Sequence, residues 1–171
     1  QRIIKPKDIL GVAWGGTMYY LIHYLNPCRK TDNSFITLHG SLNVCDYELD
    51  VDTLTRRMAM SLGGTHFELK NPGLCPSEES LEKLLTDKRI DRIFGLFRDI
   101  TISVSGCGGY DKGNMSPLAK LEYLPAGSLE ELRSKNLACD LMLRFFDEDG
   151  NEINSDVNRR TLSISTEVYR Q

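Results

Sequence analysis

Short apolar runs recur along the chain, and each is closed by glycine or polar residues. Runs of about four to eight residues bounded in this way are typical of buried strands. The first run ends in a glycine-rich turn, and Gly106-Cys107-Gly108-Gly109 follows the run from Ile100 to Ser105. The pattern predicts strands at residues 8–13, 34–38, 65–69, 100–105, 137–143 and 161–164.

Segments with helical spacing lie between these runs. The clearest is 51–62, whose apolar residues fall on one face at a period near 3.6 and which Gly63-Gly64 follows. Ser77 precedes two glutamates and is expected to cap a helix, and Ser128 with Glu131 matches a capping box. The spacing predicts helices at 17–25 and 51–62, after Ser77, through 90–97, and from Ser128 onward.

Strands and helices therefore alternate through most of the chain. This order predicts an α/β fold, a Rossmann-like and mostly parallel sheet with helices on both faces. The 171 residues are expected to form one domain, 1–171. Because ligands bind at the carboxyl ends of the strands in such sheets, the functional residues are expected in the loops that follow the strands.

Composition excludes some functions. Hydrophobic residues make up 40% and charged residues 26% of the chain, as in globular proteins, and no apolar run approaches the roughly 20 residues that span a bilayer. A net charge of −3 argues against this segment gripping nucleic acid itself. The chain begins with Gln1 and shows no signal-peptide core, so we expect a cytoplasmic protein of which this is a fragment.

Cysteines and histidines give no metal or disulfide pattern. The number of cysteines is odd and no Cys-x-x-Cys occurs, which favours reduced thiols. The three histidines are scattered, so neither a metal site nor a cofactor is predicted. The cysteines are Cys28, Cys45, Cys75, Cys107 and Cys139.

The segment Trp14-Gly15-Gly16-Thr17 joins the first strand to the first helix. Glycines let backbone N–H groups approach a phosphate, the helix start adds positive potential, and the Thr17 hydroxyl can donate a hydrogen bond. No lysine follows the glycines, so this is not a nucleotide-hydrolysing P-loop. The alternative is a tight turn that needs glycine for packing alone.

Two further loops offer polar groups or close backbone approach. His39-Gly40-Ser41 follows the second strand, and its histidine is either a ligand contact or a capping residue. Gly106-Cys107-Gly108-Gly109 follows the fourth strand, and Cys107 has no evident activating partner for a nucleophilic role.

Three carboxylates are candidates for contacts with sugar hydroxyls. Asp50 and Asp52 stand at the start of the helix 51–62, where either could instead be the N-cap. Asp140 lies at the end of an apolar strand, and a carboxylate there suggests ligand contact because burial without a partner is costly.

In order along the chain, these segments resemble the effector-binding domain of SorC-type bacterial transcriptional regulators. The resemblance covers nearly the whole chain, and its most specific part is Arg144-Phe145-Phe146-Asp147 with Gly150. The residues that carry it are Asp8 to Thr17, Leu38 to Leu42, Asp52 to Leu62, Leu137 to Asp140, Arg144 to Gly150, and Asn158 to Ser165.

The resemblance implies a fold related to glucosamine-6-phosphate and ribose-5-phosphate isomerases, and a phosphorylated sugar as effector. It further implies operator DNA bound through an N-terminal helix-turn-helix, and a homodimer or homotetramer. That DNA-binding module and the family's last segment are expected to be absent here. By position, it assigns ligand contacts to Trp14, Gly15, Gly16, Thr17, His39, Gly40, Ser41, Asp50, Asp52, Gly106, Lys120 and Asp140.

Three residues depart from the family pattern, which leaves the effector's identity open. Ser41 and Cys139 stand where the family often has glycine, and Asp52 stands where it often has asparagine. The sequence therefore predicts a ligand sensor without catalytic residues. The alternatives are a sugar-phosphate isomerase with Asp140 or Asp50 as base, and a CoA-utilising relative of the same fold.

Overall fold

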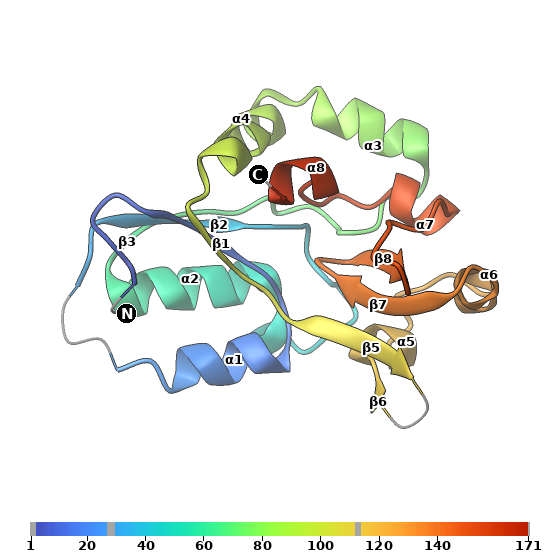
Figure 1. Cartoon of the computed structure of the whole chain (residues 1–171). Coiled ribbons are helices and arrows are strands. Elements are labelled where there is room, and N and C mark those ends of the chain that lie inside the picture. The colour runs from blue at the N-terminus through green and yellow to red at the C-terminus, as the bar shows by residue number, and fades with distance from the viewer. Residues whose placement is uncertain (1–2, 27–29, 112–113, 171) are drawn as a thin grey trace.

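The computed structural model describes residues 3–26, 30–111 and 114–170. Within them the chain forms two four-stranded sheets, one parallel and one antiparallel (Figure 1). The parallel sheet is flanked by helices, so the predicted α/β class is confirmed. The expectation that Cys28 is a reduced thiol falls on a residue outside the described ranges.

The parallel sheet has the strand order β3-β2-β1-β4. Leu10 lies between Phe35 on one side and Ile102 on the other, so β1 is a central strand with a neighbour along each edge. The strands are β1 (Ile9–Val12), β2 (Asn33–Thr37), β3 (Gly64–Phe67) and β4 (Ile102–Val104).

Helices cover both faces of this sheet (Figure 1). On one face lie α1 (Gly16–His23) and α2 (Val51–Leu62), whose Met18 and Leu54 pack on Leu10. On the other lie α3 (Glu78–Leu85), α4 (Lys88–Leu96) and α8 (Thr166–Tyr169), over a core that includes Ile36 and Leu38. Each such side chain stabilises the fold by about 1.5–3 kcal/mol on burial.

The antiparallel sheet has the order β6-β5-β7-β8 and sits beyond the carboxyl ends of the parallel strands (Figure 1). Phe145, which is fully buried, anchors a third core beneath it. The elements of this half are β5 (Cys107–Asp111), β6 (Asn114–Met115), α5 (Pro117–Lys120), α6 (Ser128–Ser134), β7 (Leu137–Leu141), β8 (Arg144–Asp147) and α7 (Asp156–Arg159). Two 3-10 helices, Tyr47–Leu49 and Phe97–Asp99, lie in the part of the chain that contains the parallel sheet.

Several sequence expectations hold at the level of single elements. The helix 51–62 has the predicted bounds, and Ser77 caps α3 by accepting a hydrogen bond from the Ser80 N–H. The prediction that Ser128 is the N-cap of a helix, as part of a capping box, was wrong. Gly127 is the N-cap of α6 in a left-handed conformation, and Ser128 lies inside the helix.

One strand prediction and one loop prediction need correction. Residues 161–164 form isolated bridges to Leu74 and His39 rather than a strand, because their backbone bonds go to two separate segments. The Gly106-Cys107-Gly108-Gly109 segment was expected to be a loop after the fourth strand, and this is wrong for most of it. Most of it belongs to β5, which continues from β4 into the second sheet.

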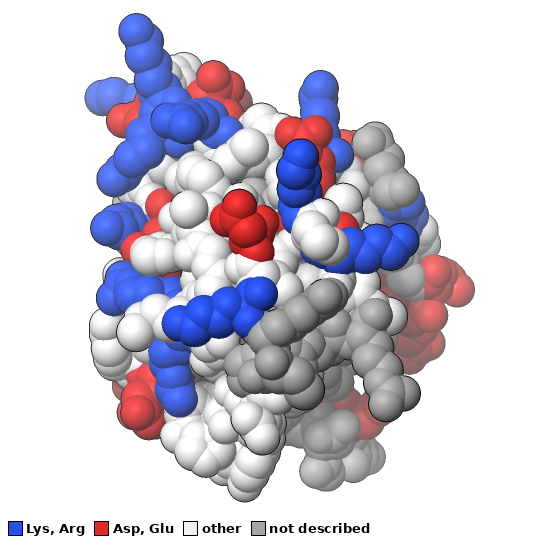
Figure 2. Space-filling view, turned by 90° about the vertical axis from the view of Figure 1, so that its left-hand side faces the viewer, with Lys and Arg blue, Asp and Glu red and all other residues white. Residues whose placement is uncertain are grey.

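The two ends of the parallel sheet differ. Figure 2 faces the end where the strands begin, and Lys and Arg side chains gather in its upper left part with Asp and Glu among them. The candidate site described below lies at the other end, where the strands finish. None of the helices in the described residues is long and apolar enough to cross a membrane.

Candidate functional site

The N-terminus of α1 is open. Gly15 is its N-cap at a φ of 110°, a conformation that favours glycine. No side chain caps this end, and its first turn holds no acidic residue. The Gly15 N–H donates to the Leu49 carbonyl at 3.0 Å, but among the described residues the N–H groups of Gly16 and Thr17 have no acceptor. This helix end therefore offers free donors and positive potential.

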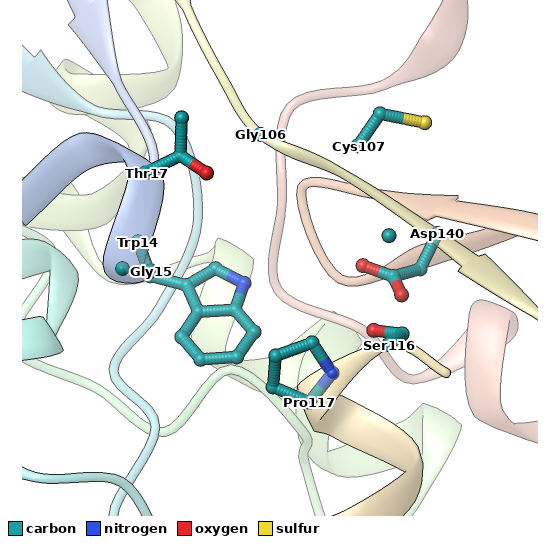
Figure 3. A pocket seen from close by; sticks show the side chains of 10 residues that line it. Trp14, Gly15, Thr17, Gly106, Cys107, Ser116, Pro117 and Asp140 are labelled. Atoms are coloured by element: carbon teal, nitrogen blue, oxygen red, sulfur yellow. The ribbon is translucent and has the colours of Figure 1, made fainter. Parts of the chain in front are cut away.

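A cavity of about 90 Å³ lies over this helix end (Figure 3). A side chain carbon added at Gly16 or Gly106 would meet no atom within 4 Å, so packing does not require glycine at either position. This favours close approach of a ligand over the packing alternative. The cavity is lined by Trp14, Gly15, Gly16, Thr17, Gly106, Cys107, Gly108, Ser116, Pro117 and Asp140.

Asp140 faces the cavity from β7 on the opposite side (Figure 3). It is only 4% exposed, and its Oδ1 atom has no hydrogen-bond partner among the residues that the structure describes. Burial raises the pKa of this carboxyl to about 6, and the nearby hydroxyls of Ser116 and Tyr110 offset part of that effect. Neither hydroxyl makes a well-formed hydrogen bond to Oδ1. A buried acceptor without a partner is costly, so this oxygen is suited to a donor from a ligand.

Gly108 lies directly across the sheet from Asp140. A side chain carbon at Gly108 would collide with the Asp140 carboxylate and with Ser116. Glycine is therefore required there so that Asp140 and Ser116 can lie against the strand. Ser116 is also the N-cap of α5, because its hydroxyl accepts from the Leu118 N–H.

Trp14 forms one side of the cavity, with its indole ring beside Pro117 (Figure 3). Its backbone N–H donates to Nε2 of His39 at 3.1 Å, while Nδ1 of that ring donates to the Gly40 carbonyl at 2.8 Å. Burial lowers the pKa of His39 to about 4, so the ring is neutral and Nε2 can accept. The expectation that His39 contacts the ligand is corrected, because the ring is fully buried and both nitrogens are used.

A second cavity, of about 460 Å³, lies at the ends of β2 and β3 and contains Ser41, Asp50 and Asp52. Asp50 is the N-cap of α2, and its carboxylate accepts hydrogen bonds from the Ser41 hydroxyl and from the N–H groups of Leu42 and Asp52. Asp52 is different, because its Oδ1 has no partner and burial raises its pKa to about 6.

Arg56 and Glu68 form a pair in the same cavity. The guanidinium donates to both carboxylate oxygens, at 2.9 Å and 3.2 Å. The Glu68 side chain is only 3% exposed, and Lys70 lies 3.5 Å from it. Most polar groups of this cavity are therefore paired with one another.

The expected ligand residues thus separate into groups. The first cavity is lined by Trp14, Gly15, Gly16, Thr17, Gly106 and Asp140. The second is lined by Ser41, Asp50 and Asp52. Gly40 lines neither, because its backbone packs against Asn71 and Gly73, and exposed Lys120 at the end of α5 also lies outside both.

Sequence reasoning missed Ser116 and Pro117 as part of the site. A signal was present, because serine followed by proline is a common helix start, with serine as N-cap and proline at the first helical position. Tyr110 and Asp111, which precede this segment, belong to β5.

An α/β domain with free donors and an unpaired carboxylate around one cavity is, by class, a small-molecule-binding domain. The family model described as "Putative sugar-binding domain" matches residues 1–171. The chain belongs to this family of sugar-binding domains. The predicted resemblance to SorC-type regulator domains is confirmed.

Known relatives agree with this assignment. The chain is 24% identical over 172 residues to the deoxyribonucleoside regulator of Bacillus subtilis, covering 99% of the chain and 53% of that protein. The full-length sorbitol operon regulator of Klebsiella pneumoniae superposes with a TM-score of 0.89 at 20% identity, over 99% of this chain and 54% of that one.

A regulator of the DeoR family from Listeria monocytogenes superposes with a TM-score of 0.86 at 23% identity, over 99% of this chain and 65% of that one. The chain spans about half the length of the curated relatives that it matches.

Proposed function

We propose that this domain binds a phosphorylated sugar in the cavity between α1 and β7, and that binding changes the affinity of the full-length protein for operator DNA. The observation that carries the proposal is that two sets of polar groups without partners face each other across one cavity. Free N–H donors at α1 face the unpartnered Oδ1 of Asp140.

These two sides of the cavity require opposite chemistry from a ligand. The helix end requires an acceptor, preferably an anion. Asp140 requires a donor such as a hydroxyl, and an anion placed against it would be repelled. A phosphorylated sugar supplies both, because its phosphate can meet Gly16 and Thr17 while a hydroxyl donates to Asp140.

The regulatory part of the proposal is supported by the relatives, which are named as a deoxyribonucleoside regulator and a sorbitol operon regulator. A ligand shifts a conformational or oligomeric equilibrium only if it binds one state better than the other. In a full-length dimer or tetramer, the sugar phosphate would stabilise the state with the higher or the lower affinity for operator DNA. DNA contact itself would be made by a helix-turn-helix domain.

The proposal is tested by comparing sugars with and without phosphate. Ribose, glucose and their phosphates are added to the full-length protein, and its melting temperature and Trp14 emission are recorded. A bound sugar phosphate at a hundredfold excess over Kd should add about 2.7 kcal/mol of stability. If only the unphosphorylated sugars bind, the phosphate assignment fails.

The Thr17 hydroxyl gives a sharper test of the phosphate position. Thr17→Ala should weaken binding of the sugar phosphate by about 1–3 kcal/mol, because a hydrogen bond to a charged group is lost. Thr53→Ala is the matched control, since Thr53 lies in the first turn of α2 at the other cavity. Equal effects of the two substitutions would contradict the assignment.

An isomerase remains the alternative because Asp140 has the raised pKa, about 6, that suits a general base. Asp50 is less suited, since its carboxylate already accepts three hydrogen bonds. Incubation with pentose and hexose phosphates decides between the two. Turnover that Asp140→Asn abolishes would replace the sensor with an enzyme.

A further inference from the structure

Two cysteines are neighbours on the antiparallel sheet. β5 and β7 pair so that Cys107 lies opposite Leu141 and Gly109 lies opposite Cys139. Residues two apart on a strand point to the same face, so Cys107 and Cys139 share a face as diagonal neighbours. Gly109 has no side chain to separate them, so nothing from β5 stands between the two thiols on that face.

This thiol pair lies on the back of the wall that forms the ligand cavity. Gly108 and Asp140, which lie opposite each other between the cysteines, face the cavity instead. Figure 3 shows the Cys107 sulfur pointing away from the cavity and the Asp140 carboxylate pointing toward it. On the thiol face lies an apolar pocket of about 260 Å³, lined partly by Leu141 and Phe146.

The two thiols differ in access. Cys107 is exposed, whereas Cys139 is half-buried. Burial, followed by the neighbouring Cys107 and Asp140, raises the pKa of the Cys139 thiol to about 11. The thiolate is the reactive form and needs access to its target. An oxidant in solution therefore reaches Cys107 first, and Cys139 is the partner that closes the bond.

Bond formation requires the strands to move. Diagonal neighbours in a sheet have Cα atoms about 7–8 Å apart, while a disulfide spans about 4.4–6.8 Å. Both strands have local freedom. Glycines stand at 106, 108 and 109 around Cys107, and the pairing of β7 with β8 shifts register between Leu137 and Cys139.

We propose that Cys107 and Cys139 form a reversible disulfide under peroxide, and that its closure reshapes the ligand cavity on the other face of β5 and β7. The Cys107 sulfur attacks the peroxide, the O–O bond breaks, and a sulfenic acid and one water result. The Cys139 sulfur then attacks that sulfenic sulfur, the S–S bond forms, and the leaving hydroxide takes the thiol proton as a second water. A dithiol reverses the reaction, since a strained bond is easily reduced.

The consequence for ligand binding rests on the proposed function. Sliding β5 along β7 to shorten this diagonal displaces Gly108 and Asp140, which lie opposite each other on the cavity side. Loss of one hydrogen bond to a charged group corresponds to about a tenfold to hundredfold weaker affinity. We expect a loss of this size in the oxidised protein.

The test uses the full-length protein treated with hydrogen peroxide and then digested without reductant. Peptide mass mapping should find Cys107 linked to Cys139, and the tryptophan emission should show a change that Trp14→Phe removes. Cys107→Ser and Cys139→Ser should abolish the link and the change. Cys45→Ser is the matched control, a half-buried thiol at the other cavity, and should alter neither.

Affinities for ribose 5-phosphate and inorganic phosphate are then measured before and after oxidation, and again after dithiothreitol. Absence of the 107–139 link, a link without a Trp14 change, or a link with unchanged affinity would each overturn the inference. If the reduced protein binds neither compound, the proposed function is in question. The link and the Trp14 emission then still decide the fate of the thiol pair.

Discussion

The helices α1 and α2 begin at the same edge of the parallel sheet, and their N-termini are capped differently. At α2, Asp50 caps the helix and also accepts from Leu42 and Ser41. At α1, the N-cap is Gly15, which has no side chain to offer, and no acid stands in the first turn. Asp50 therefore supplies an acceptor to the start of α2. Among the described residues, the N–H groups of Gly16 and Thr17 at the start of α1 have no acceptor.

Cavity volume alone would favour α2 over α1. The cavity at α2 measures about 460 Å³ and that at α1 about 90 Å³. At α2 most polar groups are paired, as in Arg56 with Glu68, and one carboxylate oxygen, on Asp52, lacks a partner. At α1 free donors and a free acceptor face each other. Unsatisfied polar groups mark a ligand site better than empty space does.

The largest effect is expected from removing the cap of α2. Asp50→Ala should destabilise the protein by about 3–4 kcal/mol, because three hydrogen bonds to one buried carboxylate are lost together. The measurement is urea denaturation. Asp50→Asn, which keeps a cap acceptor, should cost less, and exposed Asp46→Ala should cost about 0.5 kcal/mol or less. A loss below about 1 kcal/mol would show that α2 is also an open end.

Lowering the pH should destabilise the protein through protonation of His39, which contacts the α1 loop. Burial lowers the pKa of this ring to about 4 from an ordinary value of 6.5, so between these values the unfolded chain binds more protons. Stability is therefore lost as pH falls from about 6.5 to 4, by about 3 kcal/mol for this group.

Asp52 and Asp140 titrate in the same window with the opposite sign, because their pKa values are raised. The His39 contribution is therefore the difference between wild type and His39→Gln, measured by urea denaturation from pH 7 to 4. Parallel pH profiles for the two proteins would contradict the buried neutral ring.

Part of this contrast could be predicted from sequence. The 3.6-residue period fixed the bounds of α2, and a glycine pair between a strand and a helix located the α1 loop. The burial of His39 could not be predicted, since it depends on loops that only the fold brings together. The same histidine in a solvent-facing loop would have an identical local sequence.

The second sheet was harder to predict because its local sequence contradicts its structure. Glycines are depleted in strands, so Gly108 and Gly109 in β5 suggested a loop after the strand. The hairpin between β7 and β8 turns at Met142 and Leu143, with φ of 52° and 68°, where Asn-Gly is usual. Both side chains are buried, and tertiary packing therefore overrides the turn preference.

Asp140→Asn should produce opposite changes in stability and binding. Burial raises the pKa of the carboxyl to about 6 from 3.8, so the folded state loses stability as pH rises through that window. At pH 7 the neutral amide should stabilise the free protein by about 3 kcal/mol. It should also weaken sugar-phosphate binding about tenfold, because the acceptor is no longer charged.

Urea denaturation at pH 7 and 4, and titration with a sugar phosphate, measure these two effects. The gain in stability should vanish at pH 4, where the wild-type carboxyl is protonated as well. A variant less stable than wild type at pH 7 would mean that Asp140 has a partner inside the protein.

Gly16→Ala is expected to have the smallest effect on stability and bears most directly on whether the α1 end is open. The added carbon would meet no atom within 4 Å, and Gly16 is the first residue of α1. Alanine should therefore raise stability by about 0.4–1 kcal/mol through the unfolded state. The same carbon would stand in the cavity and should reduce affinity for a sugar phosphate.

Gly95→Ala is the matched control, because Gly95 also has open space around it but lies in α4, away from both cavities. It should raise stability and leave affinity unchanged. Thermal melting with and without the sugar phosphate separates the two variants. If Gly16→Ala lowers stability, the loop needs glycine for its own packing. If it raises stability without reducing affinity, the ligand does not approach α1, and the contrast between the two helix ends has no functional meaning.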